Sequence, residues 1–249
     1  MSIIALQLYT VRDETARDFA GTLRRVSELG YPAVEFADYG GLSIPQMQAL
    51  LAETGLQALS SHISLESLEQ RFEQETAYAL AIGCPTLIVP WLPPHQRTTE
   101  ALTMLAGTLN HLGRKARACG LTLGYHNHDF EFAPISDKNP TLVLDYLIEQ
   151  TDPASVSFEL DTYWAAFAGV DPVEYLQRHA GRVTLVHVKD MTPERTFTEV
   201  GAGILPIAEI VAAARTSGVQ GFLVENDQPR IPSLESAKRS LQFLRMLPE

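Results

Sequence analysis

The chain has 249 residues, of which 45% are hydrophobic, so it can bury a core large enough for one α/β domain. Its formal net charge of −11 opposes binding to phosphate backbones and anionic membranes, which argues against nucleic acid or a membrane as partner. Two cysteines, Cys84 and Cys119, are too few for a disulfide scaffold or a thiolate metal site. The amino terminus shows no leader pattern and no apolar run reaches membrane-spanning length, so we expect a cytoplasmic protein.

Short β-branched apolar runs alternate with longer segments of helical period, a pattern that predicts a parallel sheet built from βα units. Eight strands are predicted, at residues 3–8, 33–36, 57–62, 86–90, 121–127, 155–160, 183–188 and 221–225. Eight helices are predicted, at residues 18–29, 44–54, 65–82, 99–119, 139–150, 172–179, 206–217 and 233–246. We therefore predict an α/β fold, a single (β/α)8 TIM barrel domain over residues 1–249.

A doubly wound open sheet is the alternative to a closed barrel. Such sheets normally carry a glycine-rich phosphate loop directly after the first strand. Here that position reads Gln7-Leu8-Tyr9-Thr10-Val11-Arg12, which contains no glycine. The sequence therefore favours the barrel.

Polar side chains collect where the predicted strands end, which is the end of a barrel that carries the active site. Those ends hold Gln7, Tyr9, Arg12, Glu35, Asp38, His62 and Trp91, then residues 126–131, 159–164, 187–190 and 225–227. Four of the seven histidines lie among them, whereas random placement would scatter them over helices and the opposite rim. The convergence indicates a functional site.

Carboxylates with one imidazole suit a hard or borderline divalent ion such as Mn, Mg, Co or Zn. We predict one such ion, with ligands from strands five to eight: Glu131, Asp161, His187 and Glu225. Such an ion polarises a carbonyl or hydroxyl and stabilises an enediolate. Two ligands also have structural interpretations, because Asp161 could cap a helix and His187 could be a hydrogen-bonded core histidine.

Six further side chains are candidates for substrate contact: Arg12, His62, Trp91, His126, His128 and Lys189. His126 and His128 share one face of a strand because side chains alternate. Trp91 is either a stacking platform for a sugar or a packing residue of the rim. Arg12 either holds an anionic group or forms a surface salt bridge, and Lys189 either contacts substrate or pairs with Asp190.

These motifs resemble the sugar phosphate isomerase/epimerase family of the xylose-isomerase-like, or AP-endonuclease-type, barrel superfamily. The likeness covers nearly the whole chain and rests on Tyr125-His126-Asn127-His128-Asp129-Phe130-Glu131-Phe132, Asp161, His187-Val188-Lys189-Asp190 and Glu225. It implies a metal held by Glu, Asp, His and Glu from strands five to eight, and it carries over Asp161, His187 and Glu225. Relatives place the first Glu inside strand five, near Gly124 or His126, so Glu131 would reach back from the loop, and His126 is the alternative ligand.

The resemblance implies a sugar isomerase or epimerase that moves a proton next to a carbonyl of a small sugar or polyol, with Glu131 and Glu225 as the catalytic pair. The alternative is a metal-dependent lyase or dehydratase on keto-sugars or inososes, because the same groups can expel a leaving group from an enediolate. A DNA repair endonuclease would need further ligands and a basic surface, and a non-catalytic sugar-binding protein would purify without stoichiometric metal. Exposed barrel helices in such enzymes often support homodimers.

Overall fold

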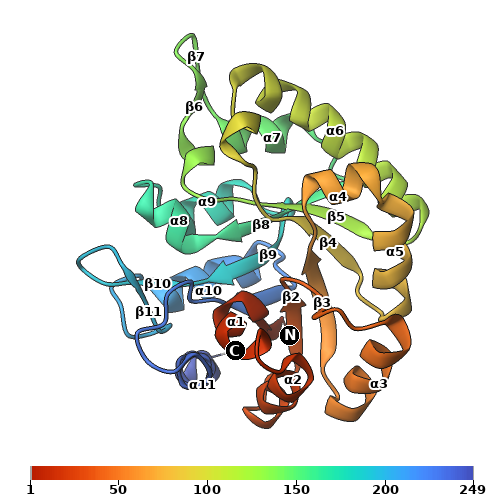
Figure 1. The fold of residues 1–249 in the computed structure, drawn as a ribbon. Helices are drawn as coiled ribbons and strands as arrows, with labels where there is room; N and C mark the ends of the chain where they lie inside the picture. The colour runs from red at the N-terminus through yellow and green to blue at the C-terminus, as the bar shows by residue number, and fades with distance from the viewer. Residues whose placement is uncertain (1, 249) are drawn as a thin grey trace.

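The computed structural model describes residues 2–248 and contains a closed barrel of parallel strands (Figure 1). The barrel strands are β1 (Ile3–Gln7), β2 (Ala33–Phe36), β3 (Gln57–His62), β4 (Thr86–Val89), β5 (Thr122–His126), β8 (Val156–Asp161), β9 (Val183–Val188) and β12 (Gly221–Val224). They pair in the order β1-β12-β9-β8-β5-β4-β3-β2. The predicted (β/α)8 TIM barrel is confirmed, and each predicted strand overlaps one of these.

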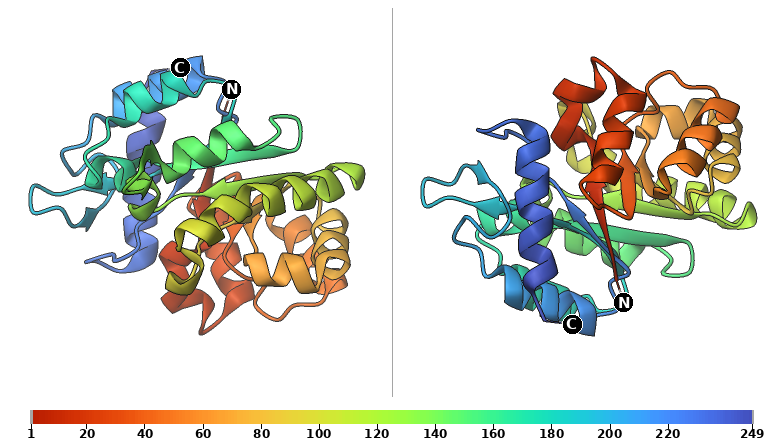
Figure 2. Two further views of the ribbon diagram at one scale, coloured as in Figure 1. Left: turned by 90° about the horizontal axis from the view of Figure 1, so that it is seen from above. Right: turned by 90° about the horizontal axis from the view of Figure 1, so that it is seen from below.

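Helices cover the outside of the barrel. The last helix, α11, lies beside the amino-terminal segment and so completes the outer layer (Figure 2). They are α1 (Arg12–Thr15), α2 (Phe19–Glu28), α3 (Ile44–Thr54), α4 (Leu65–Gln70), α5 (Phe72–Ala81), α6 (Thr99–Ala118), α7 (Val143–Gln150), α8 (Thr162–Phe167), α9 (Pro172–Arg178), α10 (Ile207–Thr216) and α11 (Ser233–Met246). Within residues 2–248 none of the helices combines the length and apolarity that a membrane crossing requires.

Two predicted helices differ from the observed ones. The segment predicted as helix over 139–150 becomes helical only at Val143, because Asn139–Leu142 forms β7 and pairs antiparallel with β6 (Pro134–Ser136). Pro140 has no backbone N–H and restricts its predecessor to extended conformations, which disfavours a helix there. The helix predicted over 65–82 is interrupted at Arg71, whose φ of −133° separates α4 from α5.

Three short helical turns and a second hairpin complete the fold. The 3-10 turns are η1 (Leu8–Val11), η2 (Pro94–Gln96) and η3 (Phe130–Phe132). The strands β10 (Asp190–Met191) and β11 (Phe197–Thr198) pair antiparallel directly after β9. The sequence analysis predicted neither hairpin and did not predict α8.

The barrel interior changes from apolar to polar along the strands. Side chains of a strand alternate between the barrel interior and the surrounding helices. A small interior cluster contains Ala5, Ala33, Ile88, Leu185 and Leu223. Two residues further along four of these strands, at the next inward position, stand the buried polar residues Gln7, Glu35, His187 and Glu225. The fold therefore places a polar layer directly above an apolar floor.

Helix α6 approaches the barrel closely at one glycine. A Cβ atom added to Gly113 would lie 2.5 Å from the Ser155 carbonyl oxygen and 2.9 Å from Val156 Cγ2. Backbone cannot move aside as a flexible side chain can, so the absent Cβ sets the distance between α6 and the segment that enters β8.

We predict that Gly113→Ala lowers the free energy of unfolding by about 1–3 kcal/mol through overpacking. This loss should exceed the gain in helix propensity from glycine to alanine, which is about 1 kcal/mol. Gly107→Ala in the same helix is the matched control, because no described atom lies within 4 Å of its added Cβ. Urea denaturation followed by circular dichroism compares the two. A Gly113→Ala protein as stable as the control would show that α6 is free to shift.

Candidate active site at the carboxyl-terminal end of the barrel

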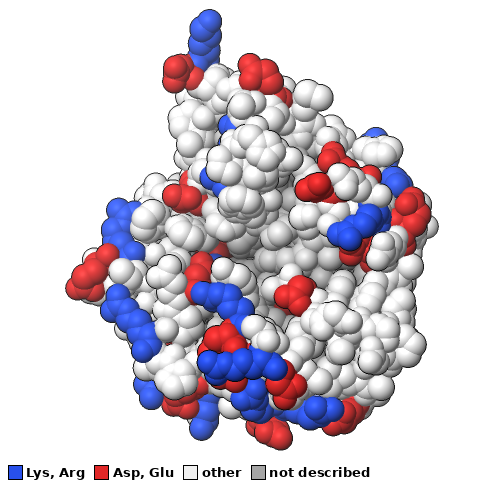
Figure 3. Space-filling model, viewed as in Figure 1, with Lys and Arg blue, Asp and Glu red and all other residues white. Residues whose placement is uncertain are grey.

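A cavity of about 670 Å³ opens where the barrel strands end. Its lining includes all six residues predicted to contact substrate, namely Arg12, His62, Trp91, His126, His128 and Lys189. It also includes Tyr9, Trp164, Phe197, Glu225 and Asp227. Figure 3 shows a hollow near the centre of this face, bordered mainly by uncharged residues. A cavity of similar volume at the other barrel end lacks His, Cys, Asp and Glu among its described lining residues.

Four ligand-type side chains from neighbouring strands meet below this cavity, and we call them the rim group: His126, Asp161, His187 and Glu225. One nitrogen or oxygen of each lies within 4.8 Å of the others. His187 Nδ1 is 2.7 Å from Glu225 Oε2, and His126 Nε2 is 3.4 Å from Asp161 Oδ2. The structure thus brings together three of the predicted ligands, with His126 in the fifth-strand position.

The rim group fits a divalent cation. His126 Nε2 is buried and makes no hydrogen bond with any residue of the described chain, whereas the Oδ2 atom of Asp161 is paired with the Lys189 ammonium at 2.9 Å. Buried polar atoms without partners are costly, so atoms of this kind are expected where a ligand belongs. Two nitrogens and two oxygens suit zinc and the other borderline divalent metals. Asp161 also caps α8, because its Oδ1 accepts the Trp164 N–H at 3.0 Å, which leaves Oδ2 for the rim group.

Lys189 connects the rim group to the cavity. Its Nζ lies 2.9 Å from Asp161 Oδ2, 2.7 Å from Glu225 Oε2 and 2.9 Å from Asp227 Oδ1. Burial alone would lower the pKa of Lys189, but the three carboxylates outweigh it and hold the pKa well above its usual value. Lys189 is therefore an ammonium that faces the cavity. The alternative pairing with Asp190 is wrong, because Asp190 accepts backbone N–H groups instead.

Glu131 does not join the rim group. Its Oε1 accepts the Tyr125 hydroxyl at 2.7 Å, and its Oε2 accepts the His128 backbone N–H at 2.8 Å. Tyr125 packs in the core outside the barrel, whereas the next residue, His126, points inward, so Glu131 lies behind β5 and away from the cavity. Burial raises the pKa of Glu131 to about 8. The expectation that Glu131 is a ligand and half of the catalytic pair is corrected, and His126 replaces it as the candidate ligand.

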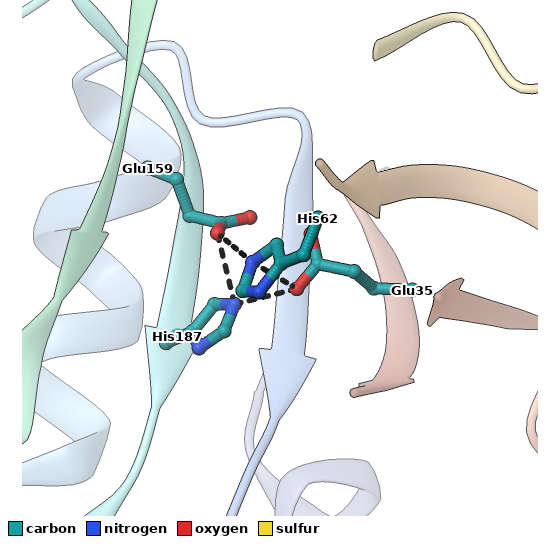
Figure 4. A group of neighbouring side chains, drawn as sticks. All are labelled: Glu35, His62, Glu159 and His187. Carbon is teal, nitrogen blue, oxygen red and sulfur yellow. Dashed lines mark hydrogen bonds and ion pairs between the residues drawn. The ribbon is translucent and has the colours of Figure 1, made fainter. Parts of the chain in front are cut away.

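A second group of ligand-type side chains lies deeper in the barrel, and we call it the inner ring: Glu35, His62, Glu159 and His187 (Figure 4). Glu159 precedes Asp161 by two residues on β8, so both point inward and Glu159 lies further from the mouth. His187 belongs to both groups. The sequence analysis noted Glu35 and Glu159 near strand ends but gave them no role. The signal that could have found them is a charged residue at an inward position of an otherwise apolar strand.

The cavity wall carries one carboxylate that the sequence analysis also left without a role. Burial raises the pKa of Asp227 to about 6, although Lys189 acts to lower it. In the same wall, burial lowers the pKa of His128 to about 2, so this imidazole is neutral. Glu225 differs from Asp227. Burial would raise the pKa of Glu225, but Lys189 and His187 outweigh it and hold the pKa well below its usual value.

The two cations nearest the cavity are already engaged with the protein. Lys189 is paired with carboxylates, as described above. Arg12 donates to the carbonyl oxygens of Tyr9 at 2.9 Å and Asp227 at 2.7 Å, and it stacks on the Tyr9 ring at 4.2 Å. Arg12 thus joins the loops after β1 and β12 rather than forming a surface salt bridge. Trp91 is 45% exposed, so its ring is accessible for stacking.

Comparison with known proteins gives consistent likenesses. An inosose dehydratase from Geobacillus kaustophilus is 32% identical over 192 residues, which cover 68% of this chain and 61% of the relative. Another from Geobacillus thermodenitrificans is 30% identical over 169 residues, covering 59% of this chain and 55% of the relative. The chain therefore spans about three fifths of the length of these curated relatives.

Solved structures match over the full barrel. A sugar phosphate isomerase/epimerase from Parabacteroides distasonis is 26% identical with a TM-score of 0.86, covering 100% of this chain and 99% of that one. A probable 3-DHS dehydratase from Bacillus anthracis is similar in fold, with 13% identity, a TM-score of 0.77 and coverage of 98% and 99%. A family model described as xylose isomerase-like TIM barrel matches residues 23–247. With the closed barrel, this match shows that the chain belongs to the xylose isomerase-like TIM barrel family.

Proposed function

We propose that this protein is a divalent-metal-dependent dehydratase of a keto-polyol or keto-sugar, which removes a proton next to the carbonyl and then expels water. The observation that carries the proposal is the rim group of metal-type ligands in direct contact with Lys189, at the floor of a cavity with aromatic walls. The curated relatives named inosose dehydratase support the dehydration step. An ion held by His126, Asp161, His187 and Glu225 would act as a Lewis acid on the substrate oxygens.

We assign the proton transfer to Asp227 and Lys189. The sequence analysis gave Glu225 the roles of both ligand and base, but a carboxylate with a depressed pKa is a poor base. Asp227 lies outside the rim group, lines the cavity and has a pKa of about 6, so it is ionised near neutral pH and basic enough to accept a proton. The Lys189 ammonium, 2.9 Å from Asp227, is placed to stabilise negative charge on substrate oxygen or to protonate the departing hydroxyl.

The cavity favours an uncharged ring. Lys189 and Arg12 are the Lys and Arg residues in its described lining, and both already have protein partners. Trp91 and Trp164 offer ring faces against which the C–H face of a sugar or cyclitol can pack. We therefore expect a neutral polyol substrate rather than a sugar phosphate.

An isomerase or epimerase is the second candidate, and the likeness to the Parabacteroides distasonis sugar phosphate isomerase/epimerase favours it. It would use the same first step, removal of a proton next to the carbonyl. It would differ in returning the proton to carbon instead of losing a hydroxyl. Mass spectrometry of the product separates the two, because only the dehydratase releases one water.

The metal assignment predicts different effects for two histidines that lie two residues apart. His126→Ala should raise the Kd for Mn²⁺ by at least about tenfold, because a ligand nitrogen is lost. His128→Ala should change the Kd little, because His128 lines the cavity outside the rim group. Titration calorimetry of metal-free protein with Mn²⁺ compares them. Loss of Mn²⁺ binding in His128→Ala with retention in His126→Ala would move the metal away from the rim group.

The base assignment predicts the fate of proton exchange in D₂O. Asp227→Asn should slow deuterium incorporation into an inosose or a 3-keto-glycoside by about 10²–10⁴-fold, because the basic oxygen is lost, while the metal stays bound. Glu131→Gln is the matched control and should exchange normally, since Glu131 lies behind β5. Nuclear magnetic resonance of the substrate, with metal content for each variant, gives the comparison. Near-normal exchange in Asp227→Asn would overturn the assignment of Asp227 as the base.

A further inference from the structure

The inner ring has a closed geometry. His62 Nε2 lies 3.0 Å from Glu35 Oε1 and 3.0 Å from Glu159 Oε2. His187 Nε2 lies 2.7 Å from Glu35 Oε1 and 3.0 Å from Glu159 Oε2. Two nitrogens and two oxygens therefore alternate around a common centre, as the dashed lines in Figure 4 show. The side chains come from β2, β3, β8 and β9, which lie on both sides of the barrel.

Hydrogen bonds alone satisfy this ring poorly. Each Nε2 carries at most one hydrogen, so at most two N–H groups serve four nitrogen–oxygen contacts. Glu159 adds a second deficit, because its Oε1 is buried and has no hydrogen-bond partner in the described chain. Glu159 is 0% exposed, so bulk water does not supply that partner. A buried carboxylate left in this way is expected to bind something else.

The size of the ring matches a metal ion. An octahedral ion with bonds of about 2.0–2.2 Å places neighbouring ligand atoms about 2.8–3.1 Å apart, because adjacent bonds meet near 90°. The four contacts of the inner ring, at 2.7 to 3.0 Å, fall close to this spacing. One divalent ion at the centre would also balance the charges of Glu35 and Glu159 with both imidazoles neutral.

Neighbouring groups hold the ring in place and leave an entrance. Gln7 Nε2 donates to Glu35 Oε1 and Ser60 Oγ donates to Glu35 Oε2, each at 2.6 Å, in the way that surrounding donors orient metal-binding carboxylates. The His62 side chain is 13% exposed and lines the cavity, so an ion can reach the ring from there.

We propose that the inner ring of Glu35, His62, Glu159 and His187 is a second divalent-cation site, one layer below the rim group. His187 offers Nε2 to this site and Nδ1, which lies 2.7 Å from Glu225 Oε2, to the rim group. With both sites filled, the two ions would share His187 as an imidazolate, whose remaining ring proton would be released to solvent when the second ion binds. The inner site stands on its own contacts and does not require that the rim group be catalytic.

The test uses Mn²⁺ as the probe and the full chain. Metal-free protein is dialysed against Mn²⁺, and bound manganese is measured by elemental mass spectrometry. The wild type should hold about two ions per chain, and Glu35→Gln and Glu159→Gln about one each. Ser61→Ala, a buried change on the same strand as His62, is the control and should keep both ions. Electron paramagnetic resonance should show magnetic coupling between ions that share His187, and this coupling should vanish in Glu159→Gln.

The rim variant Asp161→Asn separates this proposal from the proposed function. In one outcome, the wild type binds one ion that is kept in Glu35→Gln and Glu159→Gln but lost in Asp161→Asn. That result would overturn the inner site and support the rim site. One ion that is lost in Glu35→Gln and kept in Asp161→Asn would support the inner site and contradict the rim metal. A wild type without Mn²⁺ would overturn both, and the inner ring would then be a hydrogen-bonded support for His187. Circular dichroism excludes unfolding as the cause of metal loss.

Discussion

Buried carboxylates at the centre of the barrel are the constraint on which the site depends. Glu35, Glu159 and Asp161 are 0% exposed and Glu225 is 5% exposed, so none is stabilised by bulk water. Burying an unpaired carboxylate costs several kcal/mol in real proteins, of the order found for buried ion pairs that lose a partner. The chain compensates these charges with Lys189, imidazole groups and backbone or hydroxyl donors. This compensation is complete at Glu35 and at Asp161, where Lys189 lies 2.9 Å from Oδ2, and incomplete at Glu159, whose buried Oε1 atom remains without a hydrogen bond.

The two-residue period of the strands explains how such a layer arises from a short sequence. In β8 the inward positions carry Ser157, Glu159 and Asp161 in succession, so one strand supplies a residue to the inner ring and another to the rim group. In β9, Leu185 and His187 follow the same pattern. The strands β8 and β9 thus deliver their polar residues at their carboxyl ends.

The sequence allowed prediction of the barrel and of much of the rim group, because both depend on local patterns. Hydrophobic periodicity locates the strands, and parallel strands must end at one edge, which brings Asp161, His187 and Glu225 together. The role predicted for Glu131 was wrong for a physical reason. Glu131 lies in a 3-10 turn after β5, and the sequence does not reveal that the Tyr125 hydroxyl holds its side chain behind the strand. The inner ring was missed for a different reason. Its side chains meet only because β2 and β3 face β8 and β9 across the barrel, and this depends on the stagger between strands when the barrel closes.

The segment after β9 forms part of the cavity wall. Asp190 is buried and accepts the backbone N–H groups of Met191, Gly201, Gly203 and Leu205, so one carboxylate holds both ends of the β10–β11 excursion. A Cβ on Gly203 would lie 2.3 Å from Asp190 Oδ1, which requires glycine at that position. The excursion carries Phe197 to the cavity wall, near Trp164, with ring centroids 5.6 Å apart. Lys189 immediately precedes Asp190 in the chain. The hydrogen bonds of the Asp190 carboxylate therefore hold both the wall that contains Phe197 and the end of β9, from which the Lys189 ammonium reaches the rim group.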